Sequence, residues 1–242
     1  MSLKDKIAFV TGSSGGIGRE ICLSLAKQGV IVVQFGGSNK EKLTALQTEI
    51  IALGGKSYIY PGNLKDEDTL NSLFAKAISE VGGVDILINN AGVALSCSLQ
   101  DTPSKTFDDI MTINAKVPFL LIQKSLPYLK QSKRASIINI ASVVAHQGYP
   151  LQSAYTASKH ALLGLTKSLA NEVYQDGIRV HAISPGGVFT DMIKISRPDL
   201  TGEGMIAPSE IADIVMFLLV NRGNAVIDEI VVHRLNKPPF LV

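Results

Sequence analysis

The chain has 242 residues, of which 46% are hydrophobic and 18% charged, so it carries enough apolar surface for a sizeable core and is not expected to be disordered. Its formal net charge of +2 is too small to predict nucleic acid as a partner. Two cysteines, Cys22 and Cys97, indicate neither a disulfide scaffold nor a metal site. No signal-peptide core or membrane-spanning apolar run is evident, so the sequence predicts a cytoplasmic globular protein without a membrane partner.

Short apolar runs alternate with longer amphipathic stretches. The predicted strands cover residues 7–10, 30–35, 57–60, 86–89, 136–140, 179–183 and 226–232. The predicted helices cover residues 17–28, 40–53, 66–81, 106–131, 153–175 and 209–220, the fourth with interruptions near Pro118 and Pro127. This alternation is typical of βαβ units and predicts an α/β fold, a doubly wound parallel sheet with helices on both faces. Because no linker or repeat divides the chain, residues 1–242 are predicted to form one domain.

A glycine-rich segment follows the first predicted strand and has the pattern T-G-x-x-x-G-x-G from Thr11 to Gly18. Glycines let the backbone turn sharply and approach a pyrophosphate, whose charge the N-terminus of the next helix stabilises. The spacing differs from the usual G-x-G-x-x-G, and a glycine cluster alone is more typical of a plain tight turn. Its place at the first strand–helix junction favours a dinucleotide site.

The second predicted strand leads into Ser38, Asn39 and Lys40. Many NAD sites carry an acidic residue here, which holds the adenosine ribose hydroxyls. An acid would repel the 2′-phosphate of NADP, whereas these three side chains can donate hydrogen bonds to it. The segment therefore favours NADP over NAD, with a polar loop of no special function as the alternative.

Tyr155 and Lys159 stand four residues apart at the start of a predicted helix, so their side chains share one face. A free tyrosine has a pKa of about 10, and lowering it by about three units takes about 4 kcal/mol of preferential stabilisation of the phenolate. A neighbouring lysine cation supplies much of this. The pair predicts an acid/base group tuned toward neutral pH, although alone it is more typical of an exposed tyrosine beside a solvated lysine.

Two further polar residues follow predicted strands. Ser142 follows strand 136–140, and Asn114 lies in the helical region after strand 86–89. In a parallel sheet, the loops at the carboxyl ends of the strands gather around the ligand. Ser142 is therefore predicted to donate to a substrate carbonyl, and Asn114 to hold Lys159 or a bridging water. A helix-packing amide is the alternative interpretation of Asn114.

These motifs, together with Asn89-Asn90-Ala91-Gly92 and the segment from Pro185 to Thr190, resemble the short-chain dehydrogenase/reductase family, and within it the 3-oxoacyl-carrier-protein reductases. The resemblance implies a Rossmann fold of about seven strands and hydride transfer between a nicotinamide and a carbonyl or alcohol carbon. It implies that Tyr155 is the general acid/base and that Lys159 binds the nicotinamide ribose and lowers the pKa of Tyr155. Ser142 would orient the carbonyl, and Asn114 would take part in a water relay.

The resemblance also implies the ligand contacts and the assembly. The expected cofactor contacts are Gly12, Ser14, Gly16, Ile17, Gly18, Ser38, Asn39, Lys40, Asn63, Leu64, Asn90, Ala91, Gly92, Tyr155, Lys159, Pro185, Gly186, Val188 and Thr190. The expected substrate contacts are Ser142, His146 and Gln152, with a solvent-facing loop histidine as the alternative for His146. Residues 193–207 are expected to form a short substrate flap, and the chain a homodimer or homotetramer.

Two features distinguish the chain from the reductases that it resembles. Ser136 and Asn171 stand where basic docking residues for an acyl carrier are expected, and residues 224–232 lack a V-D-G-G ending. The favoured function is therefore an NADP-dependent carbonyl reductase or alcohol dehydrogenase. A 3-oxoacyl-carrier-protein reductase and a non-catalytic dinucleotide-binding sensor or scaffold are the alternatives.

Overall fold

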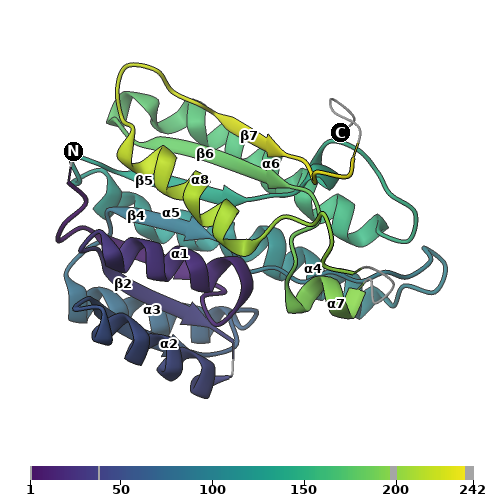
Figure 1. The fold of residues 1–242 in the computed structure, drawn as a ribbon, viewed down its shortest axis with the longest axis horizontal. Coiled ribbons are helices and arrows are strands. Elements are labelled where there is room, and N and C mark those ends of the chain that lie inside the picture. The colour runs from purple at the N-terminus through teal and green to yellow at the C-terminus, as the bar shows by residue number, and fades with distance from the viewer. Residues whose placement is uncertain (1, 38, 197–200, 238–242) are drawn as a thin grey trace.

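The computed structural model describes residues 2–37, 39–196 and 201–237, without the side chains of residues 195 and 196. Within these ranges, seven strands form one parallel sheet in the order β3-β2-β1-β4-β5-β6-β7 (Figure 1). The strands are β1 (Ile7–Thr11), β2 (Ile31–Gly36), β3 (Lys56–Pro61), β4 (Ile86–Asn89), β5 (Ser136–Ile140), β6 (Arg179–Pro185) and β7 (Glu229–Val232). The predicted doubly wound sheet of about seven strands is confirmed.

Helices cover both faces of the sheet because successive strand residues point to opposite sides. In β1, Ala8 and Val10 pack into a core with α1, α2 and α8, whereas Phe9 packs into a second core with α3, α5 and α6. The helices are α1 (Gly16–Lys27), α2 (Lys40–Ala52), α3 (Glu67–Val81), α4 (Ser104–Met111), α5 (Val117–Leu129), α6 (Ser153–Val173), α7 (Asp191–Ser196) and α8 (Pro208–Val220). None of the helices in the described ranges is long and apolar enough to cross a membrane.

The helical region after β4 differs from the prediction. It is interrupted by a π-helical turn, η1 (Thr112–Lys116), which lies before both prolines. Pro118 stands in the first turn of α5, which directly continues η1, and Pro127 lies inside that helix. Helix α5 continues through Pro127 because its buried face, including Leu121 and Leu129, packs into the second core. The predicted break at Pro127 is therefore wrong.

The last strand is shorter than predicted. Only residues from Glu229 to Val232 pair with β6, in register with Ala182 to Pro185. Val226 and Ile227 are apolar but exposed, and they lie before the strand. The predicted start of β7, which rested on hydrophobicity alone, is therefore three residues too early.

Strand order positions the site. The chain moves from β1 outward to β2 and β3, and then returns to β4 on the other side of β1. At such a switch point, the loops that leave neighbouring strands diverge and open a crevice beyond the carboxyl ends of the strands. The loops after β1, β4, β5 and β6 are therefore the ones that build the site.

Candidate active site

The turn between β1 and α1 has the backbone that a phosphate-binding loop needs. Gly12 and Gly16 have positive φ angles of 63° and 52°, which favour glycine. Helix α1 starts after Gly15, which supplies no side-chain acceptor, and its first turn contains no acidic residue. By contrast, α2 and α3 are capped by Asn39 and Asp66. The first N–H groups of α1 are thus left for an anionic ligand.

Gly18 supports this turn from within α1. A Cβ atom added there would lie 2.2 Å from the carbonyl oxygen of Gly12 and 2.6 Å from Nδ2 of Asn90. Alanine normally stabilises a helix by about 1 kcal/mol relative to glycine. At Gly18 the overlap is with backbone, so the effect is expected to have the opposite sign.

Gly18→Ala is expected to lower the free energy of unfolding by about 3 kcal/mol, since an overpacked methyl forces the backbone to move. Urea denaturation of the cofactor-free protein measures this change. Gly15→Ala is the matched control, because a Cβ at Gly15 meets no atom within 4 Å. Equal losses in both variants would contradict the steric explanation.

Loops from β1 and β4 are joined by a set of hydrogen bonds. Nδ2 of Asn90 donates to the carbonyl oxygens of Thr11 and Gly12, at 3.0 and 3.1 Å. In return, Oγ1 of Thr11 accepts from the backbone N–H groups of Asn90 and Ala91, both at 3.0 Å. The predicted cofactor residues of the two loops are therefore brought together. Thr11 was missed as a site residue, although it opens the glycine motif.

The segment after β2 is only partly described, since Ser38 lies outside the described residues. The side chain of Asn39 caps α2, where its Oδ1 accepts from the backbone N–H of Lys42 at 3.0 Å. Lys40 is exposed at the start of α2. Lys42, which sequence reasoning missed, adds a second cation here, and its Nζ lies 3.8 Å from a carboxylate oxygen of Asp191 in α7.

Among the residues predicted at the adenine end, Asn63 is exposed and its Oδ1 accepts from the backbone N–H of Lys65 at 3.2 Å. The side chain of Leu64 is buried in the second core. The side chain of Val188 is likewise buried, in the first core. If Leu64 and Val188 contact the cofactor as predicted, they do so through backbone atoms, because their side chains are buried.

Tyr155 and Lys159 lie in the first two turns of α6, and Nζ of Lys159 lies 5.8 Å from the centroid of the Tyr155 ring. Lys159 is buried, and its Nζ donates to the carbonyl oxygen of Ile140 at 2.7 Å. Burial lowers the pKa of Lys159 to about 8. The predicted pairing of the two side chains on one helix face is therefore present.

The pKa of the Tyr155 phenol differs from the prediction. Burial raises it, and a hydrogen bond with Ser142 opposes this only in part. The expected lowering by Lys159 is not found in this structure, where the ammonium group donates to the carbonyl oxygen of Ile140. The phenol is therefore protonated at neutral pH.

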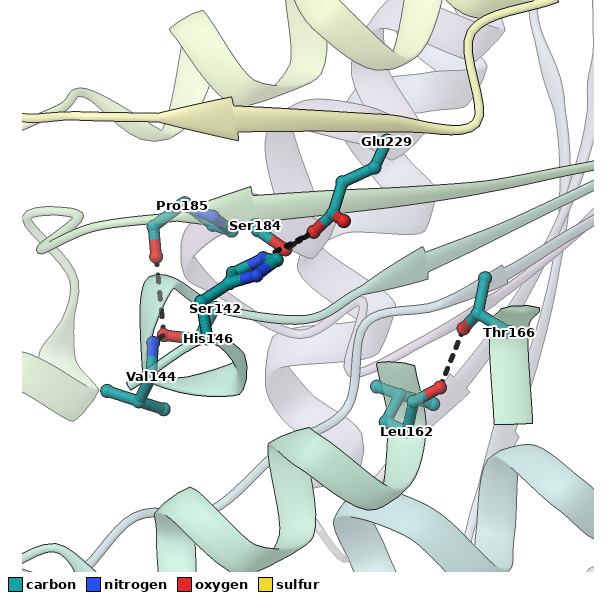
Figure 2. A network of polar contacts seen from close by, with 8 residues as sticks. All are labelled: Ser142, Val144, His146, Leu162, Thr166, Ser184, Pro185 and Glu229. Carbon is teal, nitrogen blue, oxygen red and sulfur yellow. Dashed lines mark hydrogen bonds and ion pairs between the residues drawn. The ribbon is translucent and has the colours of Figure 1, made fainter. Parts of the chain in front are cut away.

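Ser142 lies directly after β5 and caps the single turn η2 (Val143–Ala145). Its Oγ donates to the carbonyl oxygen of Pro185 at 3.3 Å and accepts from the backbone N–H of Val144 at 3.4 Å. Figure 2 shows Ser142 between these two partners. Together with its contact to Tyr155, this places the hydroxyl where the loops from β5 and β6 meet α6.

Asn114 lies in the π-helical turn and is completely buried. Its amide binds the backbone of Val93 twice, at 2.8 and 2.9 Å, and its Nδ2 also donates to Oγ of Ser158 at 2.9 Å. Around Gly92, Asn114 Oδ1 and Lys159 Nζ lie 3.4 and 3.7 Å from the position of an added Cβ. Asn114 therefore fixes the loop after β4 against α6, as the helix-packing alternative expects, and it lies with Lys159 around Gly92.

The predicted substrate contacts have different surroundings. Gln152 caps α6, and its backbone carbonyl accepts from the N–H of Thr156 at 2.7 Å. His146 is only partly exposed, and its Nε2 lies 2.7 Å from a carboxylate oxygen of Glu229. The ring of His146 is thus directed to β7. Glu229 was missed, because the sequence gives no sign that β7 meets the loop after β5.

The predicted flap at residues 193–207 is described only outside 197–200. Its first part belongs to α7, and Ile206 at its far end forms a bridge with Val188. Thr190 lies against the glycine loop, with its Cγ2 2.9 Å from the position of a Cβ added at Gly16. The segment is therefore anchored at its start through Thr190, which lies against the glycine loop, and at its far end through Val188.

The two positions compared with acyl-carrier reductases differ in exposure. Ser136 is buried at the start of β5, whereas Asn171 is exposed on α6. Neither side chain carries a positive charge, so the prediction that basic docking residues are replaced at these two positions stays a prediction.

Comparison with known proteins identifies the family. The model of the short chain dehydrogenase family matches residues 6–201. The 3-oxoacyl-acyl-carrier-protein reductase FabG of Staphylococcus aureus is 40% identical over 188 residues, which are 77% of this chain and 76% of that protein. The FabG of Thermotoga maritima is 31% identical and covers 96% of this chain and 97% of its own.

Solved structures agree with the sequence matches. A dehydrogenase/reductase from Sinorhizobium meliloti superposes with a TM-score of 0.87 at 32% identity, covering 96% of this chain and 95% of the other. A metagenomic short-chain oxidoreductase in complex with NADP gives a TM-score of 0.85 at 32% identity, covering 98% and 100%. The resemblance drawn from the motifs is confirmed, and this chain belongs to the short-chain dehydrogenase family of oxidoreductases.

Proposed function

We propose that the protein transfers a hydride between NADP(H) and a carbonyl or alcohol substrate, with Tyr155 as the general acid/base. The observation that carries this proposal is the grouping of Tyr155, Lys159 and Ser142, with Lys159 near Gly92 in the loop after β4 that also contacts the glycine loop. The uncapped N-terminus of α1 and the glycine turn fit a pyrophosphate, and Gly92 leaves space beside Asn114 and Lys159. When bound, the nicotinamide supplies or accepts the hydride.

The residues of this chain would manage the proton. In carbonyl reduction, Tyr155 Oη donates its proton to the carbonyl oxygen, and its raised pKa keeps that proton in place at neutral pH. Ser142 Oγ would leave the carbonyl of Pro185 and donate to the substrate oxygen. The Lys159 cation, which in this structure is directed to the carbonyl of Ile140, would stabilise the phenolate that remains, since a nearby opposite charge favours the ionised form. We assign Asn114 to the water relay that returns a proton toward Lys159.

NADP is the favoured cofactor for two reasons. No acid stands directly at the end of β2, and although Glu41 lies between them, Lys40 and Lys42 bring two cations to the first turn of α2, which suit a 2′-phosphate. In addition, the metagenomic relative binds NADP. The acyl-carrier reductase alternative keeps support from the 40% identical relative, so a 3-oxoacyl thioester belongs among the substrates to be tested.

We also propose a cytoplasmic homodimer or homotetramer. Exposed aromatic side chains support self-association, since large apolar groups at the surface often mark an interface. Phe107 of α4, Phe119 of α5 and Phe217 of α8 are between 41% and 49% exposed. Sedimentation velocity over a range of protein concentrations would give the oligomeric state.

A panel of ketones, aldehydes and 3-oxoacyl thioesters with NADPH and NADH tests the function through the absorbance of the reduced nicotinamide. We expect turnover with NADPH at least about tenfold more efficient than with NADH, since one hydrogen bond to a charged 2′-phosphate contributes about 1.5–3 kcal/mol. An NADH preference would overturn the interpretation of Lys40 and Lys42. Cofactor binding without turnover across the panel would favour the sensor alternative.

A further inference from the structure

Two polar side chains, Ser184 and His146, meet on one carboxylate oxygen of Glu229. Oε1 of Glu229, the first residue of β7, accepts from Oγ of Ser184 in β6 at 2.5 Å. The same oxygen lies 2.7 Å from Nε2 of His146, which ends the turn η2. Figure 2 shows Glu229 reaching from the edge strand to both partners.

Both partners adjoin the surroundings of Ser142. Ser142 caps the beginning of η2, and His146 caps its end, donating its backbone N–H to Val143 at 3.1 Å. Pro185, whose carbonyl accepts the Ser142 hydroxyl, is the residue after Ser184. One carboxylate thus holds the turn that carries Ser142 and the strand end that Ser142 contacts.

The contacts are shielded enough to hold this geometry. Ser184 is completely buried, and the side chains of His146 and Glu229 are only 23% and 20% exposed. Hydrogen bonds to an ionised carboxylate are shorter and stronger than those between neutral groups. Within the described residues, no contact joins Glu229 directly to Tyr155 or Lys159, so any effect of Glu229 on the chemistry passes through its partners.

We infer that Glu229 is a positioning residue, whose carboxylate fixes through Ser184 and His146 the orientation in which the Ser142 hydroxyl meets the substrate carbonyl. This inference rests on the proposed function. An inward-facing charge on an edge strand also discourages edge-to-edge association of sheets. The test therefore has to separate positioning from a purely structural role.

A double-mutant cycle of Glu229→Gln with Ser142→Ala distinguishes a positioning role of Glu229 from a purely structural one. Glu229→Gln keeps the shape of the side chain but removes its charge, and we expect kcat to fall about tenfold, since small misplacements of a reacting group are costly. The KM for the carbonyl substrate and the calorimetric Kd for NADPH are expected to stay within about twofold, because Glu229 is not among the residues predicted to bind either ligand. In the Ser142→Ala background, where the hydroxyl is already absent, Glu229→Gln is expected to change kcat by less than about twofold.

Glu80→Gln is the matched control. Glu80 also accepts a hydrogen bond at a sheet edge, from Tyr60 Oη at 2.9 Å, but it lies in α3, away from Ser142. Its kcat is expected to equal that of the unmodified protein.

Two outcomes would overturn the inference: full activity of Glu229→Gln, or the same tenfold loss with and without Ser142. Because Glu229→Gln conserves shape, NADPH binding reports whether the variant is folded, and loss of binding would assign Glu229 a structural role instead. Failure of the proposed function is distinguishable, since it would appear as full activity in Tyr155→Phe, whatever the Glu229 variants do.

Discussion

Tyr155→Phe is expected to lower kcat by about 10³-fold, within the range for loss of a positioned general acid. The substitution removes only the hydroxyl, so the ring keeps its place above Lys159 and beside Ser142. The Kd for NADPH is therefore expected to stay within about twofold. Single-turnover oxidation of NADPH and calorimetry measure the two quantities separately.

Tyr174→Phe is the control for this prediction. Tyr174 is 65% exposed beyond the end of α6, and its Oη accepts from Gln175 at 3.0 Å. It should retain full activity. An unimpaired Tyr155→Phe would refute the acid/base mechanism, and loss of NADPH binding in that variant would show that the phenol serves the cofactor rather than the proton.

The sheet was predictable because its strands are buried on both faces and therefore consist of continuous apolar runs. The glycine motif was predictable because its backbone conformation and close contacts admit only glycine at certain positions, such as Gly12 and Gly18. The start of β7 was not predictable, since Val226 and Ile227 are as apolar as the strand and only pairing with β6 distinguishes them.

The site was only partly predictable. Tyr155, Lys159 and Ser142 have fixed places in local motifs, and the structure brings them together. Glu229 is 83 residues from His146 along the chain, and their contact depends on the β6–β7 register. The pKa of Tyr155 depends on where Lys159 points, which the four-residue spacing leaves open.

Lys159→Met is expected to stabilise the protein while it impairs catalysis. The side chain of Lys159 is buried, and within the described residues no carboxylate pairs with its ammonium group. Burial lowers its pKa from 10.5 to about 8, which corresponds to about 3 kcal/mol of destabilisation of the charged form. The lost hydrogen bond to Ile140 offsets about 1 kcal/mol. Methionine fills a similar volume, so a net gain of about 2 kcal/mol at pH 7 is expected.

The pH dependence of this stability change follows from the protonation of Lys159 in the folded and unfolded chain. Below pH 8, Lys159 is charged in both the folded and the unfolded chain, and the full destabilisation is present. Between pH 8 and 10.5 only the unfolded chain keeps the proton, so the stability of the unmodified protein rises with pH. The advantage of Lys159→Met is therefore expected to be largest at pH 7 and to shrink by pH 10.

Urea denaturation at pH 7 and pH 10 measures the stability change, and kcat is expected to fall about 10²-fold, because the phenolate loses its neighbouring cation. Lys167→Met, at an exposed position of the same helix, should show neither effect. A Lys159→Met variant that is less stable at pH 7, or whose gain is independent of pH, would contradict the buried charge as the cause. A gain in stability together with a loss of activity is what we expect of a residue retained for its chemistry at the expense of stability. A buried cation without a carboxylate partner in an active site is such a residue.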